Sequence, residues 1–313
     1  MNMKSDIKKS VHNSIEKAVN YLLNNQHEDG SVHLGNETRW QVWETANALL
    51  AVNTVDKTQK TFLNKATTFL LTAQRDDGSF YYTPSLKPDE YCMETTSVCI
   101  LALATQNQDI HKGITFLLKK QCQDGSWEIG TPGIIKRRFW PSITGFVLNT
   151  LLQLEVSSDK IPKGIDYLLK TQQKDGSWGS NWVYYDTPYY PIHIILSALK
   201  LYGLEDTDQY LRAVKFVKEN QLNDGSWDEI TTDKPRPSVS LRTVLALYSL
   251  LVSPEKTNMS SIEKGITWLI QEQKNNGCWD GGYFVGWPGK KEDIYTTSMA
   301  ISVLKKYISL HAL

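Results

Sequence analysis

Two short motifs in the sequence could each supply a buried acid. Glu44 stands in Trp-Glu-Thr-Ala and Glu94 in Met-Glu-Thr-Thr, and an apolar segment follows each motif directly. A carboxyl group that is removed from water keeps its proton because burial raises its pKa, and a neighbouring hydroxyl such as that of Thr95 can stabilise the carboxylate once the proton has left. The helix dipole also favours Glu in a first helical turn, by roughly 0.3 to 1 kcal/mol, so capping is the alternative for each glutamate.

Asp186, in Tyr-Tyr-Asp-Thr-Pro, is a third candidate acid and ranks below the two glutamates. The alternative is ordinary turn chemistry, because Asp and Pro are both common in turns.

Aromatic side chains crowd the segments that lead into the apolar stretches. An aromatic face stabilises a nearby cation by about 0.5 to 2 kcal/mol and offers no nucleophile that would quench it. We therefore predict an aromatic-lined cavity suited to a carbocation; the alternative is a ligand-free fold whose centre the rings simply fill. The residues expected to contact the substrate are Trp43, Tyr91, Trp140, Tyr185, Tyr189, Tyr190, Trp287 and Tyr295.

Four arginines in the same segments are candidates for binding a substrate diphosphate, with a solvated surface as the alternative for each. They are Arg39, Arg137, Arg138 and Arg236. The sequence contains no Asp-Asp-x-x-Asp cluster, so ionisation of an allylic diphosphate by bound magnesium is not indicated. We expect no cofactor, and Mg²⁺ would matter only if the substrate carried a diphosphate.

The composition of the chain limits the classes of ligand and partner that we expect. Lys plus Arg and Asp plus Glu number 34 each, so no net positive charge favours nucleic acid, and a small molecule is the expected ligand. No apolar run approaches the roughly 18 to 20 residues of a membrane span, although contact with a membrane surface stays open.

The polar, basic start of the chain lacks the apolar segment of a secretory signal, which predicts a cytoplasmic protein. The four cysteines form no CxxC pair and have no zinc-finger spacing to histidine.

A motif that recurs six times indicates how these residues are positioned. It reads Gln-x-x-(Asp/Asn)-Gly-(Ser/Cys)-(Trp/Phe/Val) and begins at Gln26, Gln74, Gln121, Gln172, Gln221 and Gln273. Each copy follows an apolar segment with helical periodicity, and a second, more apolar helix follows after a loop. The chain is thus predicted to form six helical hairpins that begin near residues 14, 62, 110, 161, 209 and 261.

The difference in polarity between the paired helices predicts two concentric rings. The drier helices would form the inner wall, and those that bear Lys and Gln would face water. We therefore expect an all-α fold, an α-α barrel or toroid that spans residues 1–313 as a single domain. The motif itself is assigned to the scaffold: Gly takes a positive φ, Asp turns the chain, and the Gln amide reaches backbone groups at a neighbouring helix terminus.

The six copies resemble the QW motifs of the terpenoid cyclase and protein prenyltransferase superfamily, from about Ala18 to the C-terminus. The resemblance implies an α-α barrel in which the starts of the inner helices surround one opening of the cavity. It also implies a class II terpene cyclase, whose acid is the middle Asp of an Asp-x-Asp-Asp motif at the start of an inner helix. The larger members of that class have two or three helical domains, so this chain would be a single-domain member.

No Asp-x-Asp-Asp motif occurs in this sequence. The closest contexts are Pro-Ser-Ile-Thr at 141–144 and Pro-Ser-Val-Ser at 237–240, where hydroxyls, which cannot protonate an alkene, replace both acids. Glu44 aligns with the final acidic position of the family motif, whereas the helix register brings Glu94 close to the middle Asp. Glu94 is therefore our leading acid.

Two further segments resemble family sites at first sight. Asp-Thr-Asp-Gln at 206–209 lies between an inner helix and the next outer one, so we expect a helix N-cap there. Asp-Ile-Tyr-Thr at 293–296 stands where the prenyltransferase branch carries a zinc-binding His, and Thr296 replaces that ligand. Zinc is therefore not indicated.

We expect an enzyme that folds a linear isoprenoid, an isoprenyl diphosphate or a prenylated substrate in an aromatic cavity and cyclises it after protonation. The alternative is a non-catalytic or accessory barrel that binds a hydrophobic ligand or a partner protein, which the hydroxyls at both Pro-Ser sites favour. A carbohydrate-active α-α barrel would instead show paired carboxylates across an open, wet cleft.

Overall fold

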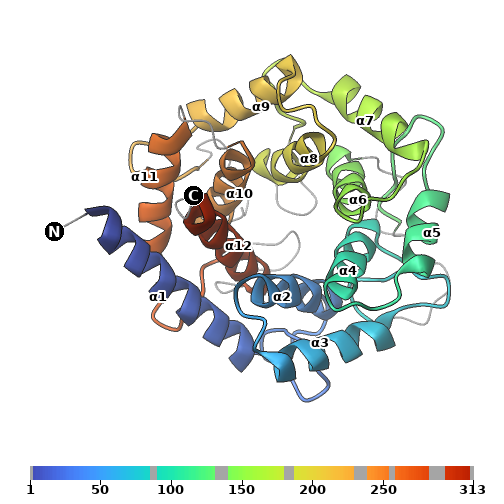
Figure 1. Ribbon diagram of the computed structural model, residues 1–313, viewed down its shortest axis with the longest axis horizontal. Helices are drawn as coiled ribbons and strands as arrows, with labels where there is room; N and C mark the ends of the chain where they lie inside the picture. The colour runs from blue at the N-terminus through green and yellow to red at the C-terminus, as the bar shows by residue number, and fades with distance from the viewer. Residues whose placement is uncertain are drawn as a thin grey trace.

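The computed structural model describes residues 3–84, 90–130, 140–179, 187–228, 238–253, 258–281 and 293–310. Within these ranges the chain forms twelve α-helices that alternate between an outer and an inner ring (Figure 1). The outer helices are α1 (Met3–Asn24), α3 (Lys60–Ala73), α5 (His111–Lys119), α7 (Lys160–Thr171), α9 (Asp208–Glu219) and α11 (Met259–Gln271). The inner helices are α2 (Gln41–Val55), α4 (Met93–Thr105), α6 (Pro141–Gln153), α8 (Tyr189–Leu201), α10 (Val239–Val252) and α12 (Ile294–Leu310). The predicted all-helical barrel of six hairpins is confirmed.

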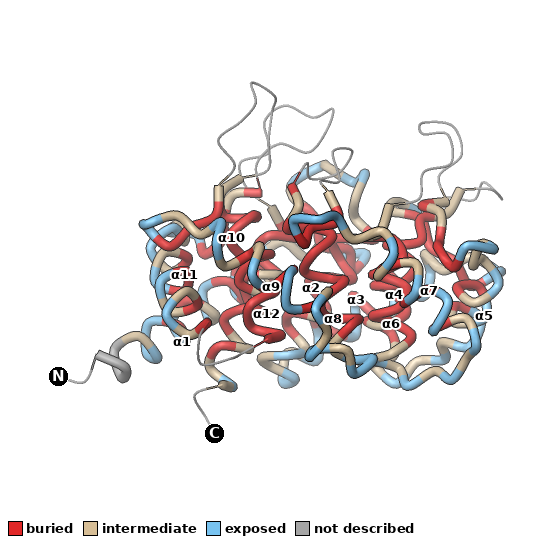
Figure 2. Tube along the Cα trace, turned by 90° about the horizontal axis from the view of Figure 1, so that it is seen from above, coloured by how far each residue is buried: buried red, intermediate tan, exposed pale blue. Residues whose placement is uncertain are grey.

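The inner helices form a closed ring. Each packs against the inner helices on its two sides, in the order α2, α4, α6, α8, α10, α12, and α12 returns to α2. At the junction of the first and last hairpins, α1 packs against both α11 and α12. Figure 2 shows the buried residues concentrated in the inner helices and the exposed residues on the outside.

The burial patterns follow from the apolar patterns of the two helix types. Helix α8 is buried without interruption over residues 189–199, because neighbours surround it on every side. Helix α9 buries only Tyr210, Ala213, Val214 and Val217, which form one stripe at helical spacing. None of the helices in the described ranges is both long and apolar enough to cross a membrane.

The repeated motif fastens each hairpin to the next. Gly30 has a φ of 90°, and a Cβ there would lie 2.2 Å from the Lys65 carbonyl oxygen on the following outer helix, so both conformation and space require glycine. The Gln26 amide donates to the Phe62 carbonyl at 3.0 Å. In the sixth copy, the Gln273 amide donates to the Ser14 carbonyl of α1 at 2.9 Å, which closes the ring. The expected scaffold geometry of the Gly and the Gln amide is present at these copies.

The expectation for 206–209 also holds. Thr207 is the N-cap of α9, and its side chain accepts a hydrogen bond from the Tyr210 backbone N–H. This acidic segment therefore begins an outer helix.

Candidate active site

Five threonines set a common register for five of the six inner helices. The Oγ1 atom of each accepts a hydrogen bond from the backbone N–H of the last motif residue in the same hairpin. The pairs are Thr45 with Val32, Thr96 with Phe80, Thr144 with Trp127, Thr243 with Trp227 and Thr297 with Trp279. Equivalent positions in different helices can therefore be counted from these threonines.

This register separates the two candidate glutamates. Glu94 stands two residues before its threonine, as do Trp43 in α2 and Tyr295 in α12. Glu44 stands one residue before its threonine, and its equivalent in α10 is Arg242. Because successive helical residues are about 100° apart around the axis, Glu44 and Glu94 leave their helices in different directions.

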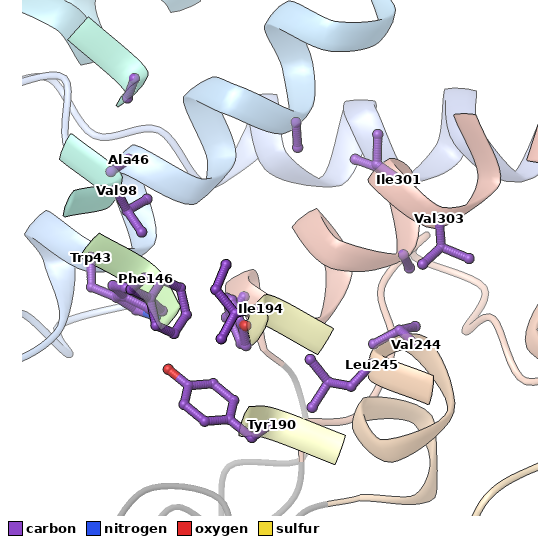
Figure 3. Close-up of a cluster of buried hydrophobic side chains, with 14 of the residues drawn as sticks. Trp43, Ala46, Val98, Phe146, Tyr190, Ile194, Val244, Leu245, Ile301 and Val303 are labelled. Atoms are coloured by element: carbon purple, nitrogen blue, oxygen red, sulfur yellow. The ribbon is translucent and has the colours of Figure 1, made fainter. Parts of the chain in front are cut away.

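Aromatic rings meet across the axis of the barrel. The centroids of the Trp43 ring of α2 and the Phe146 ring of α6 are 5.7 Å apart, although α4 stands between these helices in the inner ring. Both side chains must therefore extend toward the axis. Phe146 also contacts Tyr190 of α8 at 5.7 Å, and Trp43 contacts Tyr295 at 5.4 Å. Figure 3 shows the Tyr190 hydroxyl directed toward the Trp43 and Phe146 rings.

Glu94 completes this group. Its side chain hydrogen-bonds to the side chain of Tyr190, again across a non-neighbouring pair of inner helices, and the residue is only 4% exposed. We call Trp43, Glu94, Phe146, Tyr190, His193 and Tyr295 the axial cluster. The cluster takes one or two residues from each of five inner helices.

The electrostatics of the cluster favour a protonated carboxyl. Burial raises the pKa of Glu94 to about 8, and the hydrogen bond with Tyr190 opposes part of that rise because it stabilises the carboxylate. Among the described residues, Glu94 Oε1 has no hydrogen-bond partner. Burial, and then the nearby Glu94 carboxyl, also raise the pKa of Tyr295. At neutral pH the Glu94 carboxyl therefore keeps its proton, and one of its oxygens remains available to a ligand.

His193 adds a neutral imidazole to the cluster. It lies one helical turn after Tyr190, and its ring is 5.5 Å from the Tyr190 ring and 5.9 Å from that of Phe146. Its Nδ1 is 2.5 Å from the Tyr190 carbonyl oxygen. Burial lowers the pKa of His193 to about 4, so the ring is uncharged at neutral pH.

The structure distributes the predicted aromatic residues between two sides of the inner helices. Trp43, Tyr190 and Tyr295 join Glu94 in the axial cluster. Tyr91 and Tyr189 lie on the outer side: Tyr91 packs against Phe116 and Lys120 at the end of α5, and Tyr189 packs against Phe216 of α9. Trp140 is half-buried at the N-cap of α6.

The other predicted residues lie apart from the cluster or outside the described residues. Glu44 is buried, in the different register described above, and Arg39 is exposed in the turn before α2. The predicted residues outside the described ranges are Asp186, Tyr185, Trp287, Arg137, Arg138 and Arg236.

The sequence analysis did not single out Phe146, His193 or Tyr248, whose ring lies 5.8 Å from that of His193. All three residues lie inside helices, where a ring or an imidazole has the same pattern as a core residue. Helical spacing could have found two of them. Phe146 lies four residues after Ser142, which shares the register of Glu94, and His193 lies three residues after Tyr190.

In the part of the chain that the structure describes, no three His, Cys, Asp or Glu side chains are grouped so that they could hold a metal ion. Asp293, which begins the zinc-like segment 293–296, instead caps α12: its Oδ2 accepts hydrogen bonds from the Thr296 N–H at 2.9 Å and from the Thr296 hydroxyl at 2.6 Å.

The sequence is similar to a known protein family and to several of its members. The family model of the squalene-hopene cyclase C-terminal domain matches residues 2–133 and 140–310. The squalene–hopene cyclase of Zymomonas mobilis is 34% identical over 143 residues, which are 42% of this chain and 21% of that protein. The squalene–hopene cyclase of Bradyrhizobium diazoefficiens is 23% identical over 238 residues, 64% of this chain and 35% of that protein. The matched regions therefore span about a fifth to a third of these relatives.

Among solved structures, a variant of the type II terpene cyclase MstE from Scytonema, in complex with geranylgeranyl dihydroxybenzoate as substrate, has a TM-score of 0.78. The match covers 98% of this chain and 99% of that chain at 17% sequence identity. At this identity the likeness shows that the two proteins share a fold.

Proposed function

Because the chain belongs to the family of the squalene-hopene cyclase C-terminal domain, we propose that it is a class II terpene cyclase in which Glu94 is the acid. The observation that carries the proposal is the buried Glu94 carboxyl, with its raised pKa, among the rings of the axial cluster. A linear isoprenoid with a terminal trisubstituted double bond is the proposed class of substrate.

In the first step, the O–H bond of Glu94 breaks and its proton forms a C–H bond with the less substituted alkene carbon. The more substituted carbon becomes a tertiary cation, which the next double bond attacks to close a ring. The Tyr190 hydroxyl stabilises the carboxylate left behind, through the hydrogen bond that it makes with Glu94. The dry surroundings of Glu94 both keep it protonated before the step and keep water away from the cation.

The rings that meet at the axis are suited to the charge that this step creates. Trp43, Phe146 and Tyr295 present aromatic faces or edges around the same centre as Glu94. A cation over an aromatic face gains about 0.5 to 2 kcal/mol, and more where water is excluded. None of these three side chains is a strong nucleophile at neutral pH, so the cation can survive to the next bond formation.

We place the isoprenoid chain in the interior of the inner ring, on the C-terminal side of the axial cluster. Four apolar or aromatic residues of the inner helices support this placement, because they are only half-buried although outer helices cover their helices from outside. They are Leu50, Leu101, Tyr248 and Met299. A hydrocarbon chain that covered these surfaces would be held by the hydrophobic effect, at roughly 25 cal/mol per Å² of buried apolar area.

The head group of the substrate stays open among three chemistries: a free hydrocarbon, a prenylated aromatic and a diphosphate. The names of the relatives support the first two, because they include squalene–hopene cyclases and a cyclase bound to geranylgeranyl dihydroxybenzoate. Only a diphosphate would bring in Mg²⁺. Arg39 is the one predicted diphosphate-binding residue in the described ranges.

The proposal is tested by incubating the purified protein with squalene, geranylgeranyl dihydroxybenzoate and geranylgeranyl diphosphate in D₂O, followed by mass spectrometry of the products. We expect a cyclised product from at least one substrate, with one deuterium incorporated by the initial protonation. Glu94→Gln should abolish it, while Glu44→Gln, at a buried glutamate of the other register, should retain it. Binding of these compounds without turnover by the wild-type protein would instead support an accessory barrel.

A further inference from the structure

We infer that His193 is the base that ends the reaction, its Nε2 taking a proton from the carbon next to the final cation. This inference rests on the proposed function and adds a second catalytic residue to it. Protonation by Glu94 leaves His193 without a role, although the imidazole lies in the same axial cluster. A histidine buried in an aromatic centre is costly unless its polar atoms are used, so its chemistry needs an explanation.

The hydrogen bond of His193 determines which nitrogen can accept a proton. The Tyr190 carbonyl oxygen has no proton to give, so the Nδ1 atom 2.5 Å away must carry the hydrogen and donate it. The ring is neutral at neutral pH because burial lowers its pKa. A neutral ring with its hydrogen on Nδ1 has a lone pair on Nε2, and this nitrogen is therefore the acceptor.

The position of His193 relative to Glu94 matches the direction in which charge moves. Tyr190 lies between them: its hydroxyl bonds to Glu94, and its backbone carbonyl fixes His193 one turn further along α8. Three residues advance about 4.5 Å along a helix, so His193 lies nearer than Tyr190 to the C-terminal side on which we place the isoprenoid chain. Ring closure moves positive charge away from the carbon that Glu94 protonates, toward the position where His193 stands.

Three rings hold the imidazole in place. The Phe146 and Tyr248 rings approach it edge-on at 5.9 and 5.8 Å, from α6 and α10 on either side of α8, and the Tyr190 ring lies 5.5 Å away. With Nδ1 fixed by the carbonyl and the ring plane fixed by these contacts, Nε2 has one orientation. A positioned acceptor selects one of the several hydrogens that a tertiary cation can lose, and so one alkene isomer.

The deprotonation by His193 balances in protons and electrons. The C–H bond beside the cation breaks, its electron pair forms the new C=C bond, and the proton moves to Nε2 to give an imidazolium. The low basicity of this histidine is no obstacle, because a tertiary carbocation is a far stronger acid than an imidazolium. One proton leaves Glu94 and one arrives at His193, so the overall conversion is an isomerisation, and solvent restores both groups between turnovers.

The experiment compares the products of wild-type protein, His193→Gln, His193→Phe and the control His12→Gln. His12 makes the same kind of bond, from Nδ1 to the Lys8 carbonyl at 2.8 Å, but is exposed on α1. We expect the two His193 variants to consume substrate still, while the yield of the wild-type alkene falls by about tenfold or more in favour of isomers and alcohols. The control should keep the wild-type product.

An unchanged product from both folded His193 variants, while Glu94→Gln abolishes consumption, would overturn the role of His193 and leave the proposed function standing. Absence of turnover by the wild-type protein would overturn both. ¹⁵N NMR of histidine-labelled wild-type protein gives a readout that needs no variant to fold. We expect His193 to be neutral at pH 7 with its proton on Nδ1; a proton on Nε2 would overturn the inference.

Discussion

Tyr190 of α8 hydrogen-bonds to Glu94 of α4 across the interior of the inner ring, with α6 standing between the two helices. The contact joins an acid to the residue that can stabilise its conjugate base. It also places both side chains on the barrel axis, which no pair of neighbouring helices would require.

Removal of the Tyr190 hydroxyl should slow protonation. In Tyr190→Phe, the carboxylate loses a hydrogen bond to a charged group, which contributes about 1.5 to 3 kcal/mol, so kcat should fall roughly 10- to 100-fold. The ring remains, so substrate affinity should change little. Steady-state kinetics would show this as a loss in kcat at nearly constant KM. An unchanged kcat would mean that Tyr190 does not stabilise the carboxylate.

Activity should fall as pH rises through about 8, the pKa to which burial raises the Glu94 carboxyl. The acid must be protonated to react, so turnover should be constant well below that pH and lost above it. Consumption of substrate between pH 6 and 9.5 measures the midpoint. A profile that stays flat to pH 9.5 would argue against Glu94 as the acid.

The same carboxyl should make stability depend on pH. The folded-state pKa, about 8, lies above the ordinary value of 4.5, so the folded protein binds the proton more tightly than the unfolded chain does. The stabilisation is complete below pH 4.5 and is lost as pH rises through 8. The fall in Tm between about pH 5 and pH 8 should therefore be smaller in Glu94→Gln than in the wild-type protein, and equal slopes over this range would contradict the shifted pKa.

Phe146→Leu should damage catalysis more than a comparable change in the outer layer. It removes one ring of the axial cluster, and the loss of a cation–π contact of 0.5 to 2 kcal/mol predicts a fall in kcat of about 2- to 30-fold. Phe116→Leu is the matched control, because Phe116 is equally buried but contacts Tyr91 on the outer side of the ring. Both variants should lose similar stability, so equal losses of kcat would contradict a role for the axial ring.

Gly30→Ala should destabilise the fold strongly, because a Cβ would lie 2.2 Å from the Lys65 carbonyl oxygen and the φ of 90° is unfavourable for alanine. Gly35→Ala is the control: its φ of 52° is also positive, but nothing lies within 4 Å of the added carbon. We expect about 1 kcal/mol of destabilisation at Gly35 and more than about 3 kcal/mol at Gly30. Urea unfolding measures both, and similar values would show that the motif glycine is not needed for close packing.

The fold could be predicted from the sequence because the repeat is explicit. Six copies of the motif and two kinds of helical periodicity led to the two rings, and the Gln and Gly of the motif have the roles that their chemistry suggested. The resemblance aligned Glu44 and Glu94 with different positions of the family motif. The hydrogen bonds of Thr45 and Thr96 show directly that the two glutamates occupy different helical positions.

Of the aromatic residues that the sequence analysis named, Trp43, Tyr190 and Tyr295 lie together at the barrel axis. Tyr189 and Tyr190 are adjacent and chemically identical, yet one packs against α9 and the other reaches the barrel axis. The inner helices are buried on most of their circumference, as α8 is over residues 189–199, so their patterns do not indicate which side faces the centre. For the same reason the sequence pattern does not mark Phe146 and His193 as residues that face the barrel axis.

The bond between Gln273 and Ser14 gives the barrel a seam. At the other five junctions between hairpins the polypeptide itself continues from one to the next, whereas at this one the sixth motif meets α1 through noncovalent contacts alone. To widen the inner ring, two neighbouring hairpins must separate, and only at this junction does no peptide link join the two hairpins directly. If the ring opens, we therefore expect it to open first between α1 and its neighbours α11 and α12.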